Sequence, residues 1–253
     1  MKSTFLPMFA LLSATHSLAQ SPTPAPAKPT IIFVHGLWAD GSSWNKVIPT
    51  LQTQGYNVIS VQNPTTSIED DVAATKRAIE LANGDVILAG HSWGGFVISE
   101  AGDDPRVKAL VYIAAYAPEK GETVPSLSEK AASTALLSFF QAAEGYITLT
   151  NEGINQAFAT DLPPNEQNIA FATQQPASPN VFKAVAQHAA WKVKPTWYIV
   201  AANDKTIHPD LERLMAKRAN AKTTVLQTGH LAMLAQPQKV LEVIAEAVKQ
   251  TSK

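Results

Sequence analysis

The chain contains no cysteine among its 253 residues. This absence excludes a thiol nucleophile, a CxxC redox pair, a thiolate metal site and the lipid-bearing cysteine of a bacterial lipoprotein. The sequence also lacks an H-E-x-x-H motif, histidine pairs at metal-ligand spacing, a G-x-G-x-x-G motif and a P-loop. From these absences we expect a protein that uses no metal and no nucleotide cofactor.

Runs of basic residues are absent too, and the 20 Lys and Arg residues are balanced by 21 Asp and Glu residues. This balance argues against nonspecific binding of nucleic acid. With 45% hydrophobic and 16% charged residues, the composition is that of an ordinary globular protein, which excludes disorder and collagen-like repeats. The length allows one α/β domain or two small domains, and either buries a core that needs no disulfide or metal.

The first residues carry the pattern of a secretory signal peptide. Lys2 precedes an apolar run at residues 5–12, which is far shorter than the roughly 20 residues that cross a bilayer. Ser17 and Ala19 are small residues at the −3 and −1 positions of a cleavage site. We expect residues 1–19 to be removed after Ala19, leaving a periplasmic or secreted protein without a stable membrane anchor. A retained anchor is the alternative.

Residues 20–30 alternate small residues with prolines, which favours an extended, solvated tether over packed structure. The folded domain is therefore expected over residues 31–253. It contains six short apolar runs, at residues 31–34, 58–61, 86–89, 107–114, 196–201 and 223–226. Continuous rather than alternating apolar residues indicate strands that are covered on both faces.

Segments with helical periodicity separate most of these strands. The first lies at residues 44–51, with Ser42 or Ser43 as the cap, and the second follows the cap residue Ser67. The third begins at Pro209, and the last lies at residues 240–248. Strands that alternate with helices predict an α/β fold with a mostly parallel sheet flanked by helices. Residues 118–190 break the alternation, since they contain helical-looking apolar clusters and prolines but no clear strand. We interpret them as a mostly helical lid insertion; extra helices packed at one edge are the alternative.

The strongest motif is Gly90-His91-Ser92-Trp93-Gly94-Gly95, between the strand at 86–89 and an apolar helical run. In a G-x-S-x-G elbow, small residues flank the serine because the sharp strand-to-helix turn leaves no room for side chains. The turn exposes the hydroxyl at the end of the sheet. Ser92 is therefore the predicted nucleophile, and a glycine-rich turn with an incidental serine is the alternative.

A serine nucleophile needs a base and a group that orients the base. His230 follows the last predicted strand, where a loop would bring its ring to the carboxyl ends of the strands. His188 and His208 are expected to be surface or structural residues. His91 is next to the nucleophile, but adjacent side chains on a sharp turn diverge. His230 is therefore the predicted base.

The predicted acid is Asp204, which follows the strand at 196–201 and so lies at the edge where open α/β sheets bind ligands. Glu119 and Glu122 follow the preceding strand and are the alternatives. The order Ser92, Asp204, His230 is the nucleophile, acid, base order of α/β-hydrolases.

An oxyanion hole needs two donors. One is expected to be the backbone N–H of Trp93 and the other the N–H of Leu37, in the loop after the first strand. Gly36 lets this loop bend toward the nucleophile, and His35 is expected to be a structural hydrogen-bonding residue. Trp38 either lines the substrate pocket or simply packs.

Together these motifs resemble the α/β-hydrolase superfamily over nearly the whole mature chain: His35-Gly36-Leu37-Trp38, then residues 90–95, then Asp204-Lys205-Thr206-Ile207, then Gly229-His230. The short insertion and the stretch from Asp204 to Met233 resemble the small serine esterase branch that includes plant methylesterases and hydroxynitrile lyases. This resemblance implies cofactor-free chemistry. The lyases use a lysine near the base, whereas Leu231, Ala232 and Met233 follow His230 here, so lyase activity is not expected.

These residues predict a carboxylic ester hydrolase that works through an acyl-enzyme on a small-molecule ester. Lactonase, thioesterase, amidase and perhydrolase activities use the same triad and stay open. A catalytically slow small-ligand receptor on the same fold is the alternative from another class. Haloalkane dehalogenases and epoxide hydrolases carry an aspartate where Ser92 stands, which argues against both.

Overall fold

A six-stranded parallel sheet forms the centre of this computed structural model, which describes residues 28–251. The strands are β1 (Thr30–Val34), β2 (Val58–Val61), β3 (Val86–His91), β4 (Val107–Ile113), β7 (Thr196–Ala201) and β8 (Lys222–Leu226), in the order β2-β1-β3-β4-β7-β8. All six were predicted from the apolar runs. β1 begins at Thr30, one residue earlier than expected, so that this residue belongs to the sheet and not to the tether. The predicted signal peptide and most of the tether lie outside the described residues.

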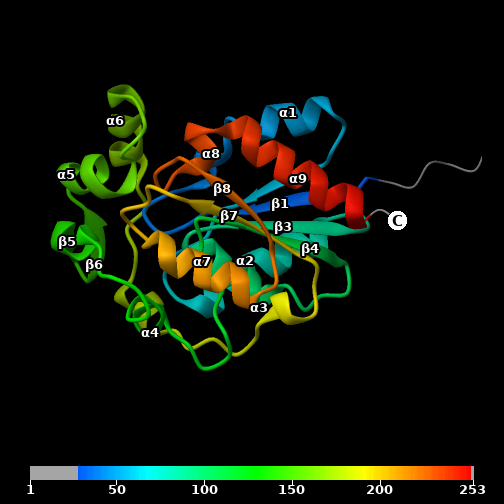
Figure 1. Cartoon of the computed structure of the whole chain (residues 1–253), viewed down its shortest axis with the longest axis horizontal. Coiled ribbons are helices and arrows are strands. Elements are labelled where there is room, and N and C mark those ends of the chain that lie inside the picture. Colours follow the sequence, from blue (N-terminus) through cyan, green and yellow to red (C-terminus); the bar gives the residue numbers. More distant parts are fainter. Residues whose placement is uncertain (1–27, 252–253) are drawn as a thin grey trace, which may run out of the picture.

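The central strands are buried along their whole length because helices cover both faces of the sheet. Every residue of β1, β3 and β7 is buried. Figure 1 shows α1 (Ile48–Thr53) and α9 (Pro237–Thr251) on one face, with α2 (Ile68–Leu81), α3 (Trp93–Ala101) and α7 (Pro209–Arg218) on the other. The α/β prediction is therefore confirmed. Among the described residues, none of the helices is both long enough and apolar enough to span a membrane.

Helix boundaries follow local chemistry. Ser67 caps α2 by accepting a hydrogen bond from the Asp70 N–H, and Pro209 is the first residue of α7. The single helix expected over residues 44–51 is wrong. A 3₁₀ turn at Gly41–Trp44, capped by Asp40 rather than by a serine, precedes a separate α1. Pro49 explains the break, because proline is tolerated in the first turn of a helix but not in its interior.

The insertion between β4 and β7 lies beyond the carboxyl ends of the strands (Figure 1). It contains α4 (Val124–Ser128), a 3₁₀ helix (Ala135–Phe139), β5 (Phe140–Ala143), β6 (Tyr146–Leu149), α5 (Asn151–Gly153), a π-helical turn (Ile154–Phe158), α6 (Pro164–Thr173) and a 3₁₀ helix (Pro179–Lys183). The expectation of no strand here is wrong, since β5 and β6 form an antiparallel hairpin. Its two-residue turn, Glu144-Gly145, has positive φ at both positions, as tight hairpin turns require.

Candidate active site

Ser92 occupies a strained turn between β3 and α3. Its φ of 54° lies in the left-handed region that side chains rarely adopt, and its side chain is nearly buried. A Cβ atom at Gly90 would lie 2.5 Å from the carbonyl oxygen of Gly94, and one at Gly94 would lie 2.2 Å from the carbonyl oxygen of Val34. The glycines of the motif are thus required by close backbone contacts, and the turn has the geometry expected of a nucleophile elbow.

His230 and Asp204, from the loops after β8 and β7, form a buried pair. The distance from His230 Nδ1 to Asp204 Oδ2 is 2.6 Å, and both side chains are fully buried. The other carboxylate oxygen of Asp204 accepts hydrogen bonds from the backbone N–H groups of Thr206 (2.6 Å) and Ile207 (3.0 Å). Because the carboxylate accepts the Nδ1 proton, Nε2 keeps its lone pair, and it has no hydrogen-bond partner among residues 28–251. This is the tautomer that a general base needs.

His91 connects the elbow to this pair. Its Nε2 donates to the backbone carbonyl oxygen of His230 (3.0 Å), and the two imidazole rings lie 4.5 Å apart. Burial, together with the neighbouring His230, lowers the pKa of His91 well below its ordinary value, so the ring is neutral at pH 7. We expected no catalytic role for His91 from the sequence, and this contact with the base was not foreseen.

The loop after β1 passes directly against Ser92. A Cβ atom at Gly36 would lie 2.6 Å from the Cβ of Ser92 and 3.1 Å from its Oγ, so only glycine fits. His35 fixes the loop from within: Nδ1 donates to the Gly36 carbonyl oxygen (2.9 Å), and Nε2 accepts from the Asn63 N–H (2.9 Å). Burial lowers the pKa of His35. These contacts agree with the structural role expected for this histidine, and they place Leu37 at the edge of the elbow.

Trp93 is the first residue of α3, so its N–H is one of those at a helix start that have no partner within the helix. Its indole Nε1 donates to Asp71 Oδ2 on α2 (2.7 Å), and Asp71 Oδ1 accepts from the Thr65 N–H (2.8 Å). Burial raises the pKa of Asp71 to about 6 despite these two bonds. Asp71 therefore anchors the residue that follows Ser92, which the sequence did not indicate.

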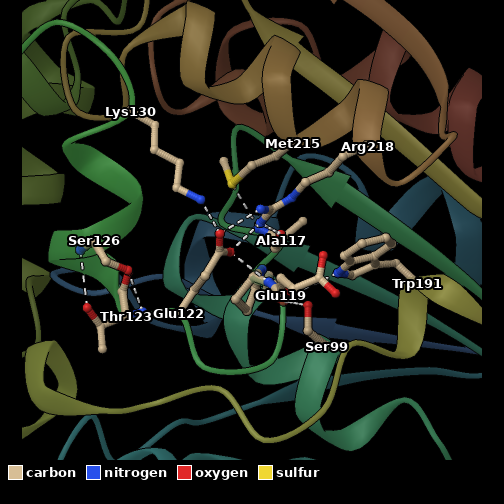
Figure 2. Close-up of polar contacts among 12 residues, drawn as sticks. Ser99, Ala117, Glu119, Glu122, Thr123, Ser126, Lys130, Trp191, Met215 and Arg218 are labelled. Carbon is tan, nitrogen blue, oxygen red and sulfur yellow. Dashed lines mark hydrogen bonds and ion pairs between the residues drawn. The ribbon is translucent and has the colours of Figure 1, made fainter.

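The alternative acids have other partners (Figure 2). Glu122 binds both terminal nitrogens of Arg218, at 2.8 and 2.6 Å, and also pairs with Lys130. Burial alone would raise the pKa of Glu122, but its bonds to Arg218 and Lys130 outweigh burial and lower that pKa. Glu119 pairs with Lys192. The structure thus brings Asp204 to His230 and holds both glutamates in ion pairs elsewhere.

The other two candidate histidines also lie where a structural or surface role was expected. His188 is more than half exposed and faces Asp103 at 3.0 Å. The side chain of His208 caps α7 by accepting from the Asp210 N–H (3.2 Å).

Residues of the insertion contact both triad loops. Asp161 Oδ2 accepts from the Gly229 N–H (2.7 Å), and the Phe158 ring lies 5.4 Å from the ring of His230. On the other loop, Thr206 Oγ1 donates to the Ala157 carbonyl oxygen (3.0 Å). The sequence places Phe158 in a helical-looking apolar cluster of the insertion but does not indicate its contact with His230, and no pattern marks Asp161, because these contacts join segments that are distant in the chain.

A buried carboxyl on α7 was also missed. Glu212 Oε2 accepts from the backbone N–H of Ala201 (2.8 Å), while Oε1 has no partner among the described residues. Burial, with Asp204 nearby, raises the pKa of Glu212 well above its ordinary value. Burial thus favours the neutral form of the Glu212 carboxyl beside Asp204.

A cavity of about 260 Å³ lies between the loop after β1, α6 and the segment after His230. Trp38, Phe158 and Leu231 line it, together with Ile169 and Ala170 of α6. Trp38 is packed, at 4% exposed, and also forms part of the wall of this cavity; that the cavity holds substrate stays a prediction. Within residues 28–251 there is no cluster of three or more His, Asp or Glu side chains that could hold a metal ion.

Comparisons with known proteins show the family and the fold of the chain. The family described as "Alpha/beta hydrolase family" matches residues 31–243. The chain is 26% identical to the alpha/beta hydrolase nvfD of Aspergillus novofumigatus, over 87% of this chain and 96% of that protein. It is 24% identical to Methylesterase 2 of Arabidopsis thaliana, over 83% of this chain and 92% of that protein. The crystal structure of polyneuridine aldehyde esterase superimposes with a TM-score of 0.75 at 16% identity, covering 87% of this chain and 99% of the other.

Proposed function

The chain belongs to the alpha/beta hydrolase family, and from this premise we propose that it hydrolyses carboxylic esters through an acyl-enzyme formed on Ser92. The observation that carries the proposal is the buried pair of His230 and Asp204, whose Nδ1 and Oδ2 atoms lie 2.6 Å apart. The other ring nitrogen of His230, Nε2, has no hydrogen-bond partner among the described residues. The backbone carbonyl oxygen of His230 accepts a hydrogen bond from His91, the residue before Ser92. Similarity to a plant methylesterase favours an ester as the substrate.

In this mechanism Nε2 of His230 takes the proton of Ser92 as Oγ attacks the ester carbonyl carbon, and Asp204 stabilises the imidazolium that forms. The N–H groups of Trp93 and Leu37 bind the oxyanion of the tetrahedral intermediate. The carbon–oxygen bond to the alcohol then breaks, and His230 returns the proton to the leaving alkoxide. Water attacks the acyl-enzyme by the same route, which releases the acid and restores Ser92.

The cavity lined by Trp38, the residue after Leu37, and by Leu231, the residue after His230, indicates which substrates suit this chemistry. Its lining exposes mainly apolar atoms. Of its three charged side chains, Lys46 and Glu166 pair at 2.7 Å, and Asp40 accepts a hydrogen bond from the Ser42 N–H. An apolar acyl or alcohol group gains free energy by leaving water for such a lining, whereas a charged group would lose its hydration. We therefore propose small, uncharged esters as substrates.

Replacing the nucleophile tests the proposal. Ser92→Ala should lower kcat for p-nitrophenyl butyrate by about 10³-fold or more, because the acyl-enzyme no longer forms. Ser138→Ala, which removes a hydroxyl from the exposed surface of the insertion, should retain wild-type kcat and serves as the control. Activity of Ser92→Ala equal to that of the wild type would sink the mechanism.

The same triad acts on lactones, thioesters and amides in other hydrolases, and a small-ligand receptor would retain it with little turnover. Steady-state assays on a matched panel of esters, lactones and thioesters distinguish these alternatives. Ester hydrolysis with many turnovers per enzyme supports the proposal. A single turnover on every substrate points to the receptor.

We also propose that the protein is exported, on the basis of Lys2 and the apolar run at residues 5–12. Mass spectrometry of the full-length gene product, recovered from the periplasm or medium of a bacterial host, should give a chain that begins at Gln20. An intact chain that begins at Met1 and stays in the membrane fraction would contradict this.

A further inference from the structure

Trp38 has an unusual backbone for a bulky residue. It directly follows Leu37, and its φ of 56° lies in the left-handed region that non-glycine residues rarely adopt. Such a conformation persists only where surrounding contacts hold it. The contacts that hold Trp38 therefore also determine where the neighbouring Leu37 N–H lies.

Those contacts come from the insertion. The indole Nε1 of Trp38 donates to the carbonyl oxygen of Ile147 on β6 (3.0 Å). The rings of Phe140, Phe158 and Phe182 lie 5.2, 6.3 and 6.4 Å from the Trp38 ring. All four partners belong to residues 118–190, and the tryptophan is only 4% exposed. Trp38 is thus embedded in the insertion although its backbone belongs to the loop after β1.

The partner strand is itself anchored. Ile147 and Ala177 exchange two backbone hydrogen bonds, at 2.8 and 2.9 Å, and the next residue, Ser178, donates to the carbonyl oxygen of Thr65 (2.9 Å). Thr65 in turn is bound through its N–H to Asp71, the residue that holds the indole of Trp93. The hairpin that holds Trp38 is therefore connected to the frame of the elbow.

At the other end of the loop, Gly36 lies against Ser92, so closely that a Cβ atom at residue 36 would not fit. Leu37 is the single residue between this contact and Trp38. A donor stabilises an oxyanion only when it lies about 2.7–3.1 Å from that oxygen, so a small shift of the loop removes the interaction.

We propose that Trp38 is a positioning residue: through its indole hydrogen bond and ring contacts, the packed insertion fixes the Leu37 N–H of the oxyanion hole. The catalytic part of this inference rests on the proposed ester hydrolysis. Since the oxyanion forms after substrate has bound, loosening the loop lowers kcat more than it changes KM.

Trp38→Phe tests the inference, because it removes the indole N–H and keeps an aromatic ring. With p-nitrophenyl butyrate, kcat should fall about tenfold or more while KM changes less than about threefold. Trp191→Phe is the matched control: Trp191 Nε1 also donates to a backbone carbonyl oxygen, that of Pro118 (2.7 Å), and its replacement should leave kcat unchanged. A rise in KM at constant kcat would show that Trp38 is only a wall of the pocket and would overturn the proposal.

A second readout does not depend on turnover. Hydrogen–deuterium exchange of the peptide covering residues 33–42 should be several-fold faster in Trp38→Phe than in the wild type, and unchanged in Trp191→Phe. Phe182→Leu, a change in the insertion alone, should accelerate the same peptide and lower kcat, and it decides the question if Trp38→Phe does not fold. Wild-type exchange in both Trp38→Phe and Phe182→Leu, or faster exchange without loss of kcat, would overturn the inference. If the wild type hydrolyses nothing in the panel, ester hydrolysis fails and exchange alone decides the coupling.

Discussion

The loops after β4 and β7 leave neighbouring parallel strands at the same edge of the sheet, and each carries a carboxylate. Asp204 faces His230 and two backbone N–H groups. Glu122 forms ion pairs with Arg218 and Lys130. Only the first carboxylate can orient an imidazole. Position at the sheet edge makes both residues candidates, and of the two only Asp204 has an imidazole as its partner.

The comparison predicts the largest change in kcat for a substitution of Asp204. Asp204→Asn should lower kcat for p-nitrophenyl butyrate by about 10³- to 10⁴-fold, because the amide no longer selects the tautomer with a free Nε2. Glu122→Gln is the matched control at the other loop and should change kcat less than about threefold. If the two variants lost activity equally, the distinction between the loops would be wrong.

A third carboxylate, Asp71, accepts from two hydrogen-bond donors and forms no ion pair within residues 28–251, and burial raises its pKa to about 6. A raised pKa in the folded state means that its contribution to stability is complete below about pH 4 and is lost as pH rises through about 6. The free energy of unfolding of the wild type relative to Asp71→Asn should therefore fall by about 3 kcal/mol between pH 4 and pH 7. Urea denaturation of both proteins across this range measures it, and parallel pH curves would contradict it.

The contribution of Glu122 to the stability of the fold should depend on pH in the opposite direction. Its pKa is lowered because Arg218 and Lys130 outweigh burial, so its ion pairs stabilise the fold above its ordinary pKa and lose that effect as pH falls below it. At pH 7, Glu122→Gln should cost about 1–2 kcal/mol of unfolding free energy. The difference in unfolding free energy between Glu122→Gln and the wild type should shrink toward pH 3. A difference that grows toward pH 3 would refute the stabilising role of the Glu122 ion pairs.

The smallest expected effect concerns His208, and His230 provides the contrast. His208→Gln removes a helix cap and should cost about 0.5–1 kcal/mol of unfolding free energy, with kcat unchanged. His230→Gln should lower kcat as strongly as Ser92→Ala. Thermal denaturation and steady-state kinetics on the two variants check both statements. A loss of kcat in His208→Gln beyond about threefold would mean that this loop takes part in the reaction.

The sequence predicts those parts of the molecule that depend on local sterics or on burial. Continuous apolar runs locate all six strands of the main sheet. Burial on both faces accounts for the runs of β1, β3 and β7, whereas the edge strand β8 is largely exposed, so the expectation that it is covered on both faces is wrong. Gly90 and Gly94 identify the elbow, because the turn itself requires them. Chain order then places Asp204 and His230 at one edge of the sheet.

The insertion could not be predicted in the same way, because its structure depends on contacts between distant segments. Trp38 binds the carbonyl oxygen of Ile147, 109 residues away. Asp161 reaches Gly229, and no local pattern marks either partner. The hairpin is the exception, since Glu144-Gly145 is a two-residue turn of recognisable type that the helical-looking cluster at residues 136–140 obscured.

Covalent labelling with a p-nitrophenyl alkylphosphonate tests the central claim most directly. Attack by the Ser92 Oγ on phosphorus releases p-nitrophenol and leaves one phosphonyl group on the enzyme. Peptide mapping should place the group on Ser92, and labelling should be much slower in Asp204→Asn than in Glu122→Gln. Labelling at another residue, no labelling, or equal rates in the two variants would contradict the assignment of Ser92, His230 and Asp204.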